Sequence, residues 1–596
     1  MEDAVFIPAF PGAEGFGAKS VGGRGGRVFE VTNLNDRGPG SLRAAIEAEG
    51  PRTVVFRVGG TIELESSLRI ENPYITIAGQ TAPGGGITLR NSADHARTPL
   101  IIQTNDVIVR HIRSRPGGNV NEIGTLDAIT IASDKQNVYN VIVDHSSFSW
   151  ATDEVANIYY DAHDITIQWS ILSEGLDCST HIEAGERQCH STGLLIGSNG
   201  AENISIHHNL FAHNRNRNPR IKTTGLVDVV NNVIYNPGFG PSYRSPSYVH
   251  GGRAVVPVNY IGNFFKPGAD TGSADWFIDT KQDVQVYLEG NVSPTQVIDP
   301  ESLEEVVPIR HAAAPITTTS AQVAYDKILE QAGASYGLAC DGTRFIRRDP
   351  VDTRIIQEVQ QGSGQIIDDP MDVGGWPQLS AGIPCLDTDR DGMPDAFEAL
   401  YGFNPSNLSD STEDADGDVY TNLEEYLNGT NPLVSSVLST QDPGFSNGSA
   451  IPNTTSIKIE AEDIDNITGY RIERNRAASG HQMLSLVRQS HGEVGTVNYT
   501  FNGPAANYDV QIGTFDEDDG QASFALKLNN LPIGQVELDA QLGGKGAASA
   551  ANAVTLGMAS RVALKPGDII TVTGFENARE HARLDFIEFT AAPIFR

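Results

Sequence analysis

The feature that most limits the fold is a pattern that recurs eight times between residues 74 and 293. Each copy starts with alternating β-branched residues, turns at Asn, His or Gly, and continues as a second short apolar strand. The copies lie roughly 22 to 40 residues apart, a period that is typical of solenoids. No helical pattern separates the strands, so we predict a parallel β-helix instead of leucine-rich or helical repeats. An antiparallel sandwich of hairpins is the alternative, but it would require Asn-Gly turns at a shorter spacing. The copies are YITIAGQ, NDVIVRHIRS, NVIVDHSSFS, DITIQWSILS, NISIHHNLFA, LVDVVNNVIY, PVNYIGNFFK and VQVYLEGNVS.

The ends of such a solenoid need caps, because each coil buries few side chains and depends on its neighbours for a core. Ser41 is suited to be a helix N-cap, with Leu42, Ala45 and Ile46 on one face of the helix that follows. We therefore predict an N-terminal cap helix over 42–48. Segments 321–334 and 353–362 have amphipathic spacing and are expected to fold back as helices over the last coil.

The length of 596 residues is too great for one ordinary core. After residue 432 the sequence becomes rich in Ser, Asn and Pro, as in a linker. Beyond it, short strands and turns alternate densely, which indicates a jelly-roll β-sandwich. The predicted division is a β-helix with its helical cover over 1–380, a calcium-binding segment over 381–432, a linker over 433–455 and a sandwich over 456–596.

Two loops in the calcium-binding segment carry oxygen ligands at the EF-hand positions 1, 3, 5, 9 and 12. The first has Gly392 at the sharp turn, whereas the second has Val419 where glycine is preferred. An acidic surface loop is the alternative in each case. An all-protein oxygen shell leaves no open ligand position, so calcium here is expected to be structural. The predicted ligands are Asp387, Asp389, Asp391, Asp395 and Glu398 in the first loop, and Asp414, Asp416, Asp418, Asn422 and Glu425 in the second.

The strongly negative net charge limits the classes of molecule that this protein is expected to bind. A formal net charge of −33 argues against nucleic acid, which requires a broad basic face, and suits a protein that binds divalent cations. No apolar run is long enough to span a bilayer, so no membrane partner is expected.

Pairing of Cys178 with Cys189 and of Cys340 with Cys385 would fit an oxidising compartment, although free buried thiols are the alternative. The start, MEDAVF, contains no export signal, and we expect that one was trimmed.

One cationic stretch stands out in this acidic chain: residues 207–222, HHNLFAHNRNRNPRIK. It contains Arg215, Arg217, Arg220 and Lys222. The stretch follows an alternating strand, and Asn-Pro at 218–219 favours an extended turn. The sequence therefore predicts a guanidinium cluster at a sheet edge, where it is able to hold carboxylates; a solvated basic loop is the alternative.

Equivalent positions of successive coils line up on one face of a β-helix. We therefore expect Asp127, Asp153 and Asn157 to converge with these cations. A calcium ion facing guanidinium groups would neutralise the carboxylate of an acidic sugar and acidify the proton on the adjacent ring carbon. A base then removes that proton and the glycosidic oxygen leaves, which is β-elimination.

Three stretches, FPGAEGFG…GGRGGRVFEVTNLND, VIVDHSSFSWATDE and HHNLFAHNRNRNPRIK, resemble the pectate lyases of the right-handed parallel β-helix class. The resemblance covers roughly residues 7–365 and implies cleavage of de-esterified pectin (polygalacturonate) by a secreted, calcium-dependent enzyme. In that family the first arginine of an R-x-P-x-x-R motif is the base, which falls on Arg217; Lys222 stands at the last position instead of arginine.

The same resemblance assigns calcium to Asp127, Asp153 and Asn157, the last being commonly an aspartate in the family. We expect Arg220, Arg215 and His190 to bind substrate, while the lysine that the family uses falls near Thr192 and is missing. A free guanidinium does not lose its proton near neutral pH, so Arg217 requires a depressed pKa or an alkaline optimum. Lys222 is the chemically easier base and remains the alternative.

The C-terminal region resembles jelly-roll carbohydrate-binding modules that hold a structural calcium between their first and last strands. The resemblance places Glu460, Glu462 and Asp585 at that site. The sugar-stacking aromatic side chain is left open among Tyr470, Tyr499 and Tyr508.

The prediction is thus a monomeric pectate lyase with an appended carbohydrate-binding module. A β-helix galacturonan hydrolase is one alternative; it would need paired carboxylic acids, for which Asp153 and Glu154 are candidates. A non-catalytic polysaccharide-binding adhesin is the other. Elimination creates a conjugated double bond that absorbs ultraviolet light, hydrolysis does not, and an adhesin gives no products.

Overall fold

The structure is a computed structural model in which the chain divides into two compact units, residues 1–439 and 440–596. The predicted linker, 433–455, lies mostly outside the described residues, and the boundaries predicted around it stay predictions. The structure describes residues 7–435 and 456–591, except 119–124, 184, 199, 239–244, 251–254, 273–277, 281–282, 294–304, 465, 480–481, 487–493, 503–505, 517–521, 530, 539–547, 550–551, 566 and 577–580. None of the helices in these ranges has the length and apolarity needed to cross a membrane.

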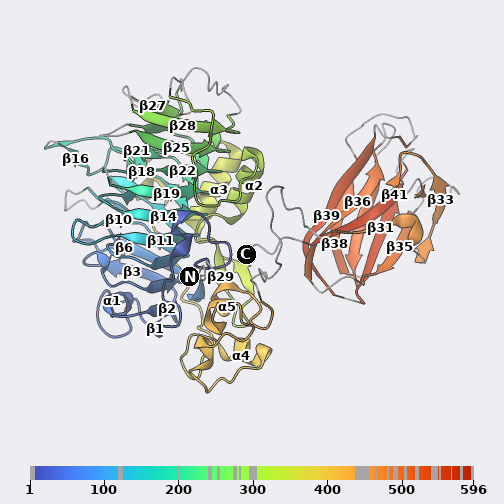
Figure 1. Cartoon of the computed structure of the whole chain (residues 1–596), viewed down its shortest axis with the longest axis horizontal. Helices are drawn as coiled ribbons and strands as arrows, with labels where there is room; N and C mark the ends of the chain where they lie inside the picture. The colour runs from blue at the N-terminus through green and yellow to red at the C-terminus, as the bar shows by residue number, and fades with distance from the viewer. Residues whose placement is uncertain are drawn as a thin grey trace, which may run out of the picture. The chain divides into compact units, whose positions relative to one another are not determined.

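The first unit is a parallel β-helix, as the repeats predict. Three parallel sheets run along its stacked coils (Figure 1), and we call them sheets A, B and C. Sheet A contains β1 (Arg27–Val31), β2 (Arg52–Phe56), β5 (Ile75–Ala78), β8 (Val107–Arg110), β11 (Tyr139–Asp144), β14 (His163–Gln168), β19 (Glu202–His207), β22 (Val227–Val230), β25 (Val256–Ile261) and β28 (Val284–Glu289). Sheet B contains β3 (Gly60–Leu64), β6 (Ile87–Asn91), β9 (Ile112–Ser114), β12 (Ser147–Ser149), β15 (Ile171–Ser173), β20 (Leu210–Ala212), β23 (Val233–Tyr235) and β26 (Phe264–Lys266). Sheet C contains β4 (Leu68–Ile70), β7 (Leu100–Ile102), β10 (Ile129–Ile131), β13 (Glu154–Ile158), β18 (Thr192–Ile196), β21 (Arg220–Ile221), β24 (Ser247–Val249) and β27 (Ile278–Thr280).

The core fills the inside of the coils with one aliphatic side chain stacked on the next. The alternating start of each repeat is a strand of sheet A, and its inward residues pair in register from coil to coil. One such row is Ile75, Val107, Val141, Ile165, Ile204, Val227, Val258 and Val286. All eight side chains are fully buried, so neighbouring coils supply the hydrophobic contacts that no coil has alone.

The turn between sheets A and B is held by a ladder of asparagines. The backbone N–H of Asn209 donates to Asn232 Oδ1, that of Asn232 to Asn263 Oδ1 and that of Asn263 to Asn291 Oδ1, at 3.0, 2.9 and 2.9 Å. The side-chain amide of Asn232 also donates to Ile206 O at 2.8 Å and to Asn263 Oδ1 at 3.0 Å. The ladder satisfies backbone groups that the sharp turn takes out of the sheets.

We expect Asn232→Ala to lower the free energy of unfolding of the first unit by about 3 kcal/mol, because buried donors and acceptors on both neighbouring coils lose their partners. Asn232 is fully buried, whereas Asn35 is exposed, so Asn35→Ala is the matched control and is expected to be neutral. Chemical denaturation followed by circular dichroism measures both. Equal stability of the two variants would contradict a structural role of the ladder.

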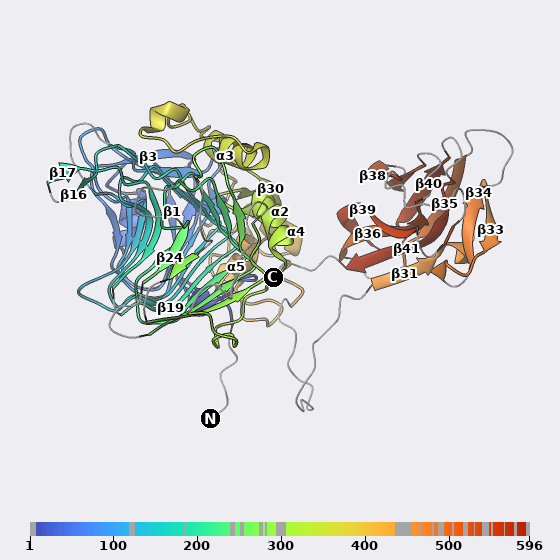
Figure 2. The ribbon, with the colours of Figure 1, turned by 90° about the horizontal axis from the view of Figure 1, so that it is seen from above.

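Helices cover the end and one side of the solenoid. Ser41 caps α1 (Leu42–Glu47) by accepting a hydrogen bond from Ala44 N at 3.2 Å, and α1 closes the first coils as predicted. Both amphipathic segments are helical, α2 over Ala321–Gln331 and α3 over Pro350–Gln361. They contact the last strand of sheet B, as expected over the last coil, and also extend along the outer side of that sheet (Figure 2).

The predicted calcium-binding segment, 381–432, packs against the first coils of the same unit. It contains α4 (Asp395–Tyr401) and α5 (Asn422–Asn428), whose apolar side chains contact sheet A and the hairpin of β29 (Tyr336–Leu338) and β30 (Arg344–Ile346). Arg24 Nε lies 2.8 Å from Glu424 Oε1, and Arg110 Nη1 donates to Asn428 Oδ1 at 2.8 Å. The Cys340–Cys385 disulfide also ties this segment to the hairpin.

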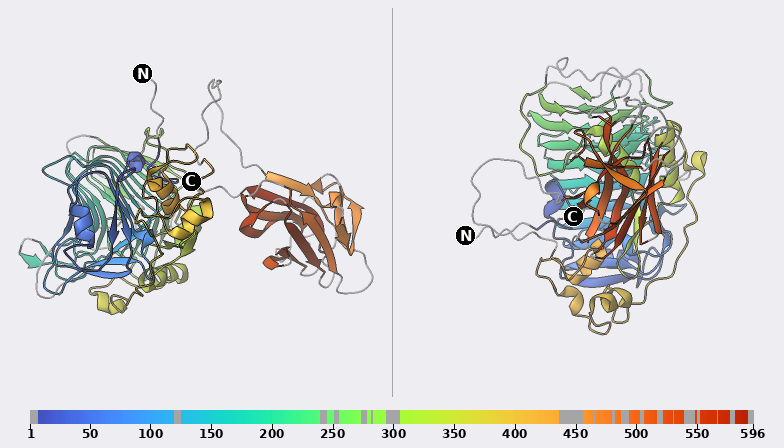
Figure 3. Two further views of the ribbon diagram at one scale, coloured as in Figure 1. Left: turned by 90° about the horizontal axis from the view of Figure 1, so that it is seen from below. Right: turned by 90° about the vertical axis from the view of Figure 1, so that its right-hand side faces the viewer.

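The second unit is a β-sandwich of two antiparallel sheets, as predicted (Figure 3). Its core is aliphatic and aromatic, and includes Phe501, Phe524 and Phe589. One sheet contains β33 (Tyr470–Arg474), β34 (Gln482–Leu486), β41 (Leu584–Ala591), β36 (Ala506–Phe515) and β39 (Ala553–Leu564), with β31 (Ser456–Glu460) paired to β41; the other contains β32 (Asn466–Thr468), β35 (Val494–Thr500), β40 (Ile569–Phe575), β37 (Ser523–Leu528) and β38 (Leu531–Glu537).

Candidate functional site

Carboxylates from two neighbouring coils meet at the edge of sheet C. Pairing of β10 with β13 sets Thr130 beside Asn157, and the same register sets Asp127 beside Glu154. Ligand oxygens of Asp127, Asp153 and Glu154 all lie within 4.8 Å of one another. The solenoid therefore brings together, from two coils, an acidic cluster that consists of these three residues.

Hydrogen bonds fix the carboxylate of Asp127 in the cluster. Its Oδ2 accepts from Thr130 Oγ1 at 2.6 Å and from Asn157 Nδ2 at 3.2 Å, while its Oδ1 accepts from Glu154 N at 3.2 Å. Burial and the neighbouring Asp153 charge raise the pKa of Asp127. Burial also disfavours ionisation of Asp153, but its close contact with His190 and the surrounding positive charges lower its pKa.

The donor set of this cluster suits calcium, a hard cation that takes carboxylate and amide oxygens. Three carboxylates held together in a half-buried site repel one another unless a cation lies among them. Within the part of the chain that the structure describes, buried Asn157 Oδ1 has no hydrogen-bond partner. Asp127, Asp153 and Asn157 are the three residues that the resemblance names, and their ligand role stays a prediction.

The cationic stretch reaches the same edge of sheet C. Arg217 forms an ion pair with Glu154 of the acidic cluster, and its guanidinium is mostly buried. Its backbone lies in the left-handed region, with φ 59°. This conformation is uncommon in general for a residue other than glycine, but it recurs at the turns of this β-helix, for example at His145 and Asn231. The geometry thus places the predicted base beside the predicted metal ligands.

Arg220 begins β21, and Lys222 follows directly after this strand. Register pairs the outward Arg220 with Leu195 and, one coil further, Leu195 with Asn157. The Arg220 guanidinium lies 5.2 Å from the ring centre of Tyr248, and Lys222 is exposed. Neither cation has an ion pair among the described residues, so both are available to an anionic ligand.

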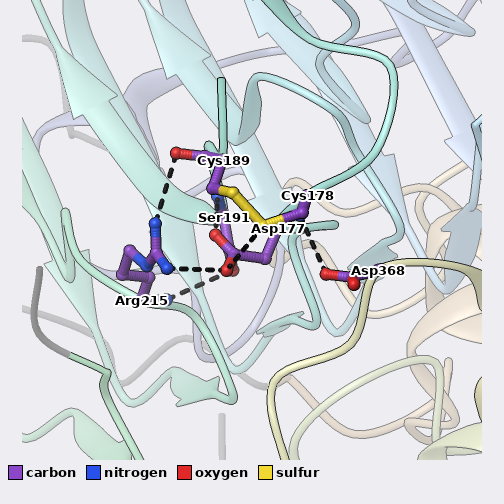
Figure 4. Close-up of a disulfide and its surroundings, with 6 residues drawn as sticks. All are labelled: Asp177, Cys178, Cys189, Ser191, Arg215 and Asp368. Carbon is purple, nitrogen blue, oxygen red and sulfur yellow. Dashed lines mark hydrogen bonds and ion pairs between the residues drawn. A yellow bond between two sulfur atoms is a disulfide. The ribbon is translucent and has the colours of Figure 1, made fainter. Parts of the chain in front are cut away.

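Arg215 is engaged by a neighbour of the first disulfide. Its Nη2 lies 2.8 Å from Asp177 Oδ2, and its backbone N–H donates to Ser191 Oγ at 3.2 Å (Figure 4). Both predicted cysteine pairs are disulfides, Cys178 with Cys189 and Cys340 with Cys385, which excludes the free-thiol alternative. His190, the third predicted substrate contact, points at Asp153 with Nε2 3.0 Å from Oδ1.

Sequence reasoning missed Glu154 as a member of the acidic cluster and missed His181 altogether. Glu154 is adjacent to Asp153, and only the pairing of β10 with β13 shows that both face Asp127. His181 is buried beside His190, with ring centres 3.9 Å apart. The signal that was available for His181 is its position inside the loop closed by Cys178 and Cys189.

The two calcium-type loops have the same internal hydrogen bonds. Asp387 Oδ1 accepts from Arg390 N and its Oδ2 from Gly392 N, at 2.8 and 3.2 Å. In the second loop, Asp414 accepts from Gly417 N and Val419 N in the same way, at 2.7 Å each. Asp391 and Asp418 each accept from the backbone N–H two residues on. Both segments are therefore folded into the same ordered loop and not into irregular acidic turns.

The first loop gathers Asp389, Asp391, Glu398 and Asp410, whose ligand oxygens lie within 4.8 Å of one another. Asp410 was missed because it lies outside the twelve-residue template. Asp395, a predicted ligand, uses both oxygens to accept hydrogen bonds from Thr388, at 2.7 Å each. Burial and the neighbouring carboxylates raise the pKa of Asp391 to about 7 and that of Glu398 to about 8. Across the described residues, Asp389 and Glu398 have no hydrogen-bond partner at either carboxylate oxygen, and Glu425 of the second loop likewise.

The remaining predicted ligands of the second loop are Asp416 and Asn422. Asp416 Oδ1 accepts from Asp418 N at 3.1 Å, and burial with the nearby carboxylate of Asp418 raises the pKa of Asp416 to about 6. Asn422 Oδ1 accepts from Ala415 N at 3.2 Å, the same position that Asp395 uses in the first loop. An oxygen-seeking divalent cation therefore fits both loops.

Val419 occupies a strained position in the second loop. Its φ is 80°, and Gly392 at the same place in the first loop has φ 96°. A β-branched residue is unfavourable in this region by roughly 1–3 kcal/mol. We expect Val419→Gly to raise the free energy of unfolding by about 1 kcal/mol, the relief of strain being partly offset by glycine's greater freedom in the unfolded chain.

Thermal unfolding measured with and without calcium tests the Val419 prediction, with Val419→Ala as the control that removes β-branching but keeps a side chain at positive φ. It should fall between the wild type and the glycine variant. A glycine variant that is less stable than both would contradict the assignment of strain.

The C-terminal unit has carboxylates at its first and last strands. Glu460 ends β31 and Asp585 lies on β41, the strand that pairs with it. Ser479 donates to Glu460 Oε1 from its hydroxyl and to Asp585 Oδ2 from its backbone, at 2.8 and 3.0 Å. Glu462 follows in the next turn, at a half-buried position. Two of the aromatic candidates, Tyr470 and Tyr508, are buried in the core, while Tyr499 stacks on Phe589 with ring centres 5.7 Å apart.

Comparison with known proteins places the chain among one group of enzymes. A protein of Aspergillus flavus described as "Probable pectate lyase C" is 37% identical over 443 residues, which cover 72% of this chain and 94% of that protein. A protein of Emericella nidulans with the same description is 37% identical over 441 residues, covering 71% and 93%. Among solved structures, a pectate lyase from Bacillus sp. N165 in complex with trigalacturonate matches with a TM-score of 0.37 at 16% identity, covering 54% of this chain and 98% of that one. No family model matches the sequence.

Proposed function

The chain belongs to the pectate lyase family, and from that premise we propose that it cleaves polygalacturonate by calcium-dependent β-elimination. One observation supports this proposal above the others: the acidic cluster and the cationic stretch share one edge of sheet C, joined by the ion pair of Arg217 with Glu154. An acidic polymer needs cations to bind, and an elimination needs a base beside a neutralised carboxylate.

Asp127, Asp153, Glu154 and Asn157 would hold the calcium ion. Bound there, calcium neutralises the substrate carboxylate and stabilises the negative charge that develops when the adjacent carbon loses its proton. Glu154 would supply the acidic ligand that is absent at Asn157, where the family commonly has aspartate. The same carboxylate also orients Arg217 through their ion pair.

Arg220 and Lys222 would bind the carboxylates of successive sugars. The planar guanidinium of Arg220 suits a bidentate contact with a carboxylate, and its place over Tyr248 keeps it oriented. Lys222 is exposed and serves as a mobile point charge. Arg215 is held by Asp177, so in our proposal it positions the loop and contacts substrate less directly than Arg220.

Arg217 is the proposed base. Because it is fixed by Glu154 and lies at a positive-φ turn, its guanidinium is directed rigidly at the edge of the acidic cluster. A guanidinium releases its proton only at high pH, so the proposal includes an alkaline optimum. Lys222 remains the alternative base. Separate substitution of Arg217 and of Lys222 shows which of the two is required for turnover.

The other regions extend this proposal. The two loops of the 381–432 segment would hold structural calcium against the first coils, and the sandwich would bind carbohydrate, with a third calcium at Glu460, Glu462 and Asp585. The two disulfides fit an oxidising compartment, and we propose that the protein is secreted.

Ultraviolet absorbance of polygalacturonate digests tests the proposed function. We expect the absorbance to increase with time when calcium is present. The increase should stop when a chelator is added and resume with excess calcium. Reducing ends without absorbance would instead identify a hydrolase, and binding without products an adhesin. Either of those two results would refute the proposal.

A further inference from the structure

A pair of stacked imidazoles adjoins the acidic cluster. The rings of His181 and His190 are inclined by only 6°, with centres 3.9 Å apart. Both rings face one carboxylate oxygen, since His190 Nε2 lies 3.0 Å and His181 Nδ1 lies 3.9 Å from Asp153 Oδ1. Ligand atoms of all three residues lie within 4.8 Å of one another.

The ring nitrogens that face Asp153 lie beside its carboxylate without a well-aligned hydrogen bond. Over the described ranges, neither His181 Nδ1 nor His190 Nε2 has a hydrogen-bond partner of acceptable geometry, although His181 is only 4% exposed. A buried polar atom without a partner is uncommon and requires an explanation. His181 also hydrogen-bonds the backbone of Thr152, the kind of contact that orients a metal-binding imidazole.

The disulfide loop holds both rings in place. Cys178 and Cys189 close an insertion that projects from the coils as the short hairpin of β16 (Ile182–Glu183) and β17 (Glu186–Arg187) (Figure 1). Gln188 N donates to His181 O and His190 N donates to Asp177 O, at 3.1 and 2.9 Å. These bonds anchor both ends of the insertion, so the rings approach Asp153 from a rigid loop.

A second group of the same residue types differs, because its carboxylate already has hydrogen-bond partners within the fold. His111, Asp144 and His145 also lie close together. There, however, Asp144 accepts hydrogen bonds from Arg110 and Gln168, at 2.9 and 2.8 Å, and its charge is neutralised within the fold. Asp153 has no such arginine contact among the described residues, and its two histidine neighbours leave their facing nitrogens available.

We propose that His181, His190 and Asp153 form a binding site for a d-block divalent cation such as Zn²⁺. Imidazole nitrogen suits zinc, copper and nickel, whereas calcium takes oxygen ligands. Ligands of a tetrahedral zinc ion at about 2.0–2.1 Å are about 3.4 Å apart, and the two measured distances, 3.0 and 3.9 Å, lie on either side of this value. Three protein ligands leave the fourth position open to water or substrate.

The site has a consequence for activity that rests on the proposed function. Asp153 belongs both to this group and to the acidic cluster. A zinc ion that takes Asp153 removes a ligand from the calcium site and adds a positive charge beside it. Zinc is therefore expected to inhibit the lyase, and calcium to relieve that inhibition.

Cobalt tests the site without any activity measurement. We expect the calcium-free protein to bind one Co²⁺ with the intense visible absorption of a low-coordinate, nitrogen-ligated ion, and Zn²⁺ to displace it. His190→Gln and His181→Gln are each expected to weaken Zn²⁺ binding, measured by calorimetry, at least about 100-fold. His163→Gln is the matched control, because His163 also contacts a carboxylate, 2.8 Å from Asp164, but is 33% exposed and stacks on Tyr139 instead of on a second imidazole.

His190 is the more exposed of the two rings, so its variant remains interpretable even if His181→Gln fails to fold. Retention of the cobalt spectrum and of zinc affinity in His190→Gln would overturn the site. Suppose that zinc binding is lost in His190→Gln, but calcium does not relieve the inhibition of the wild type by zinc. This result would keep the site and overturn the shared role of Asp153. Absence of lyase activity in the wild type would refute the proposed function, while the cobalt spectrum would still decide the site.

Discussion

Arg217→Ala is expected to lower the rate of elimination about 10³-fold, the usual scale for removing a positioned acid–base group. The side chain is both the proposed base and the partner of Glu154. Removing it leaves the acidic cluster without its nearest cation, so calcium is expected to bind at least as tightly as in the wild type. Loss of turnover with calcium affinity retained is therefore the signature of a catalytic role. Initial rates from ultraviolet absorbance and calcium titration measure the two quantities.

Two further variants sharpen this prediction. Lys222→Ala is expected to raise KM with a smaller effect on kcat, since an exposed cation that binds carboxylates contributes mainly to substrate affinity. Arg471→Ala, at an exposed position in the C-terminal unit, is the control and should be silent. If Lys222→Ala abolishes turnover and Arg217→Ala does not, the two roles must be exchanged.

The pH dependence offers an independent criterion. A guanidinium base predicts a rate that rises well into the alkaline range, because the fraction of unprotonated base grows with pH. A lysine base would reach its plateau earlier. The profile of kcat/KM in the wild type thus distinguishes the two candidates without substitution.

The sequence predicts the solenoid well because the strands of sheet A carry their own signal. Most of them have alternating aliphatic residues, and the last four, β19, β22, β25 and β28, lead into a turn residue of the asparagine ladder, such as Asn232. The strands of sheet C carry little signal, since several of them are only two or three residues long, such as β21 and β10. The functional edge of the fold is therefore the part that local periodicity describes least.

Only part of the candidate site could be predicted from the sequence. Asp127, Asp153 and Arg217 could be named because they stand in motifs, whereas Glu154 and His181 depend on which coil lies beside which. Asp410 joins the first calcium-type loop from outside the twelve-residue template, and Asp395 instead bonds to Thr388. In each case the missing information is spatial, namely the register of β10 with β13 or the path of the chain after a loop.

Asp127→Ala is expected to reduce the rate of elimination about 100-fold or more at ordinary calcium concentrations. The reason is that its side chain links both coils of the acidic cluster. Its oxygens accept from Thr130, Asn157 and Glu154. Without it, the cluster loses one carboxylate and the hydrogen bond that orients the Asn157 amide. We expect the calcium concentration for half-maximal activity to rise and high calcium to restore part of kcat.

Glu398→Gln separates the proposed catalytic calcium from the proposed structural one. Glu398 is buried in the first loop, and among the described residues its group of ligand oxygens has no member in common with the acidic cluster on sheet C. We expect it to lower Tm in calcium, since the first loop packs on the first coils through Met393 and Phe397, while kcat at saturating calcium stays unchanged. Asp127→Ala should do the reverse: it reduces turnover strongly, while calcium still raises its Tm as in the wild type. If Glu398→Gln lowers kcat at saturating calcium as much as Asp127→Ala does, the two proposed calcium sites are not independent, and the assignment of catalysis to the sheet C edge fails.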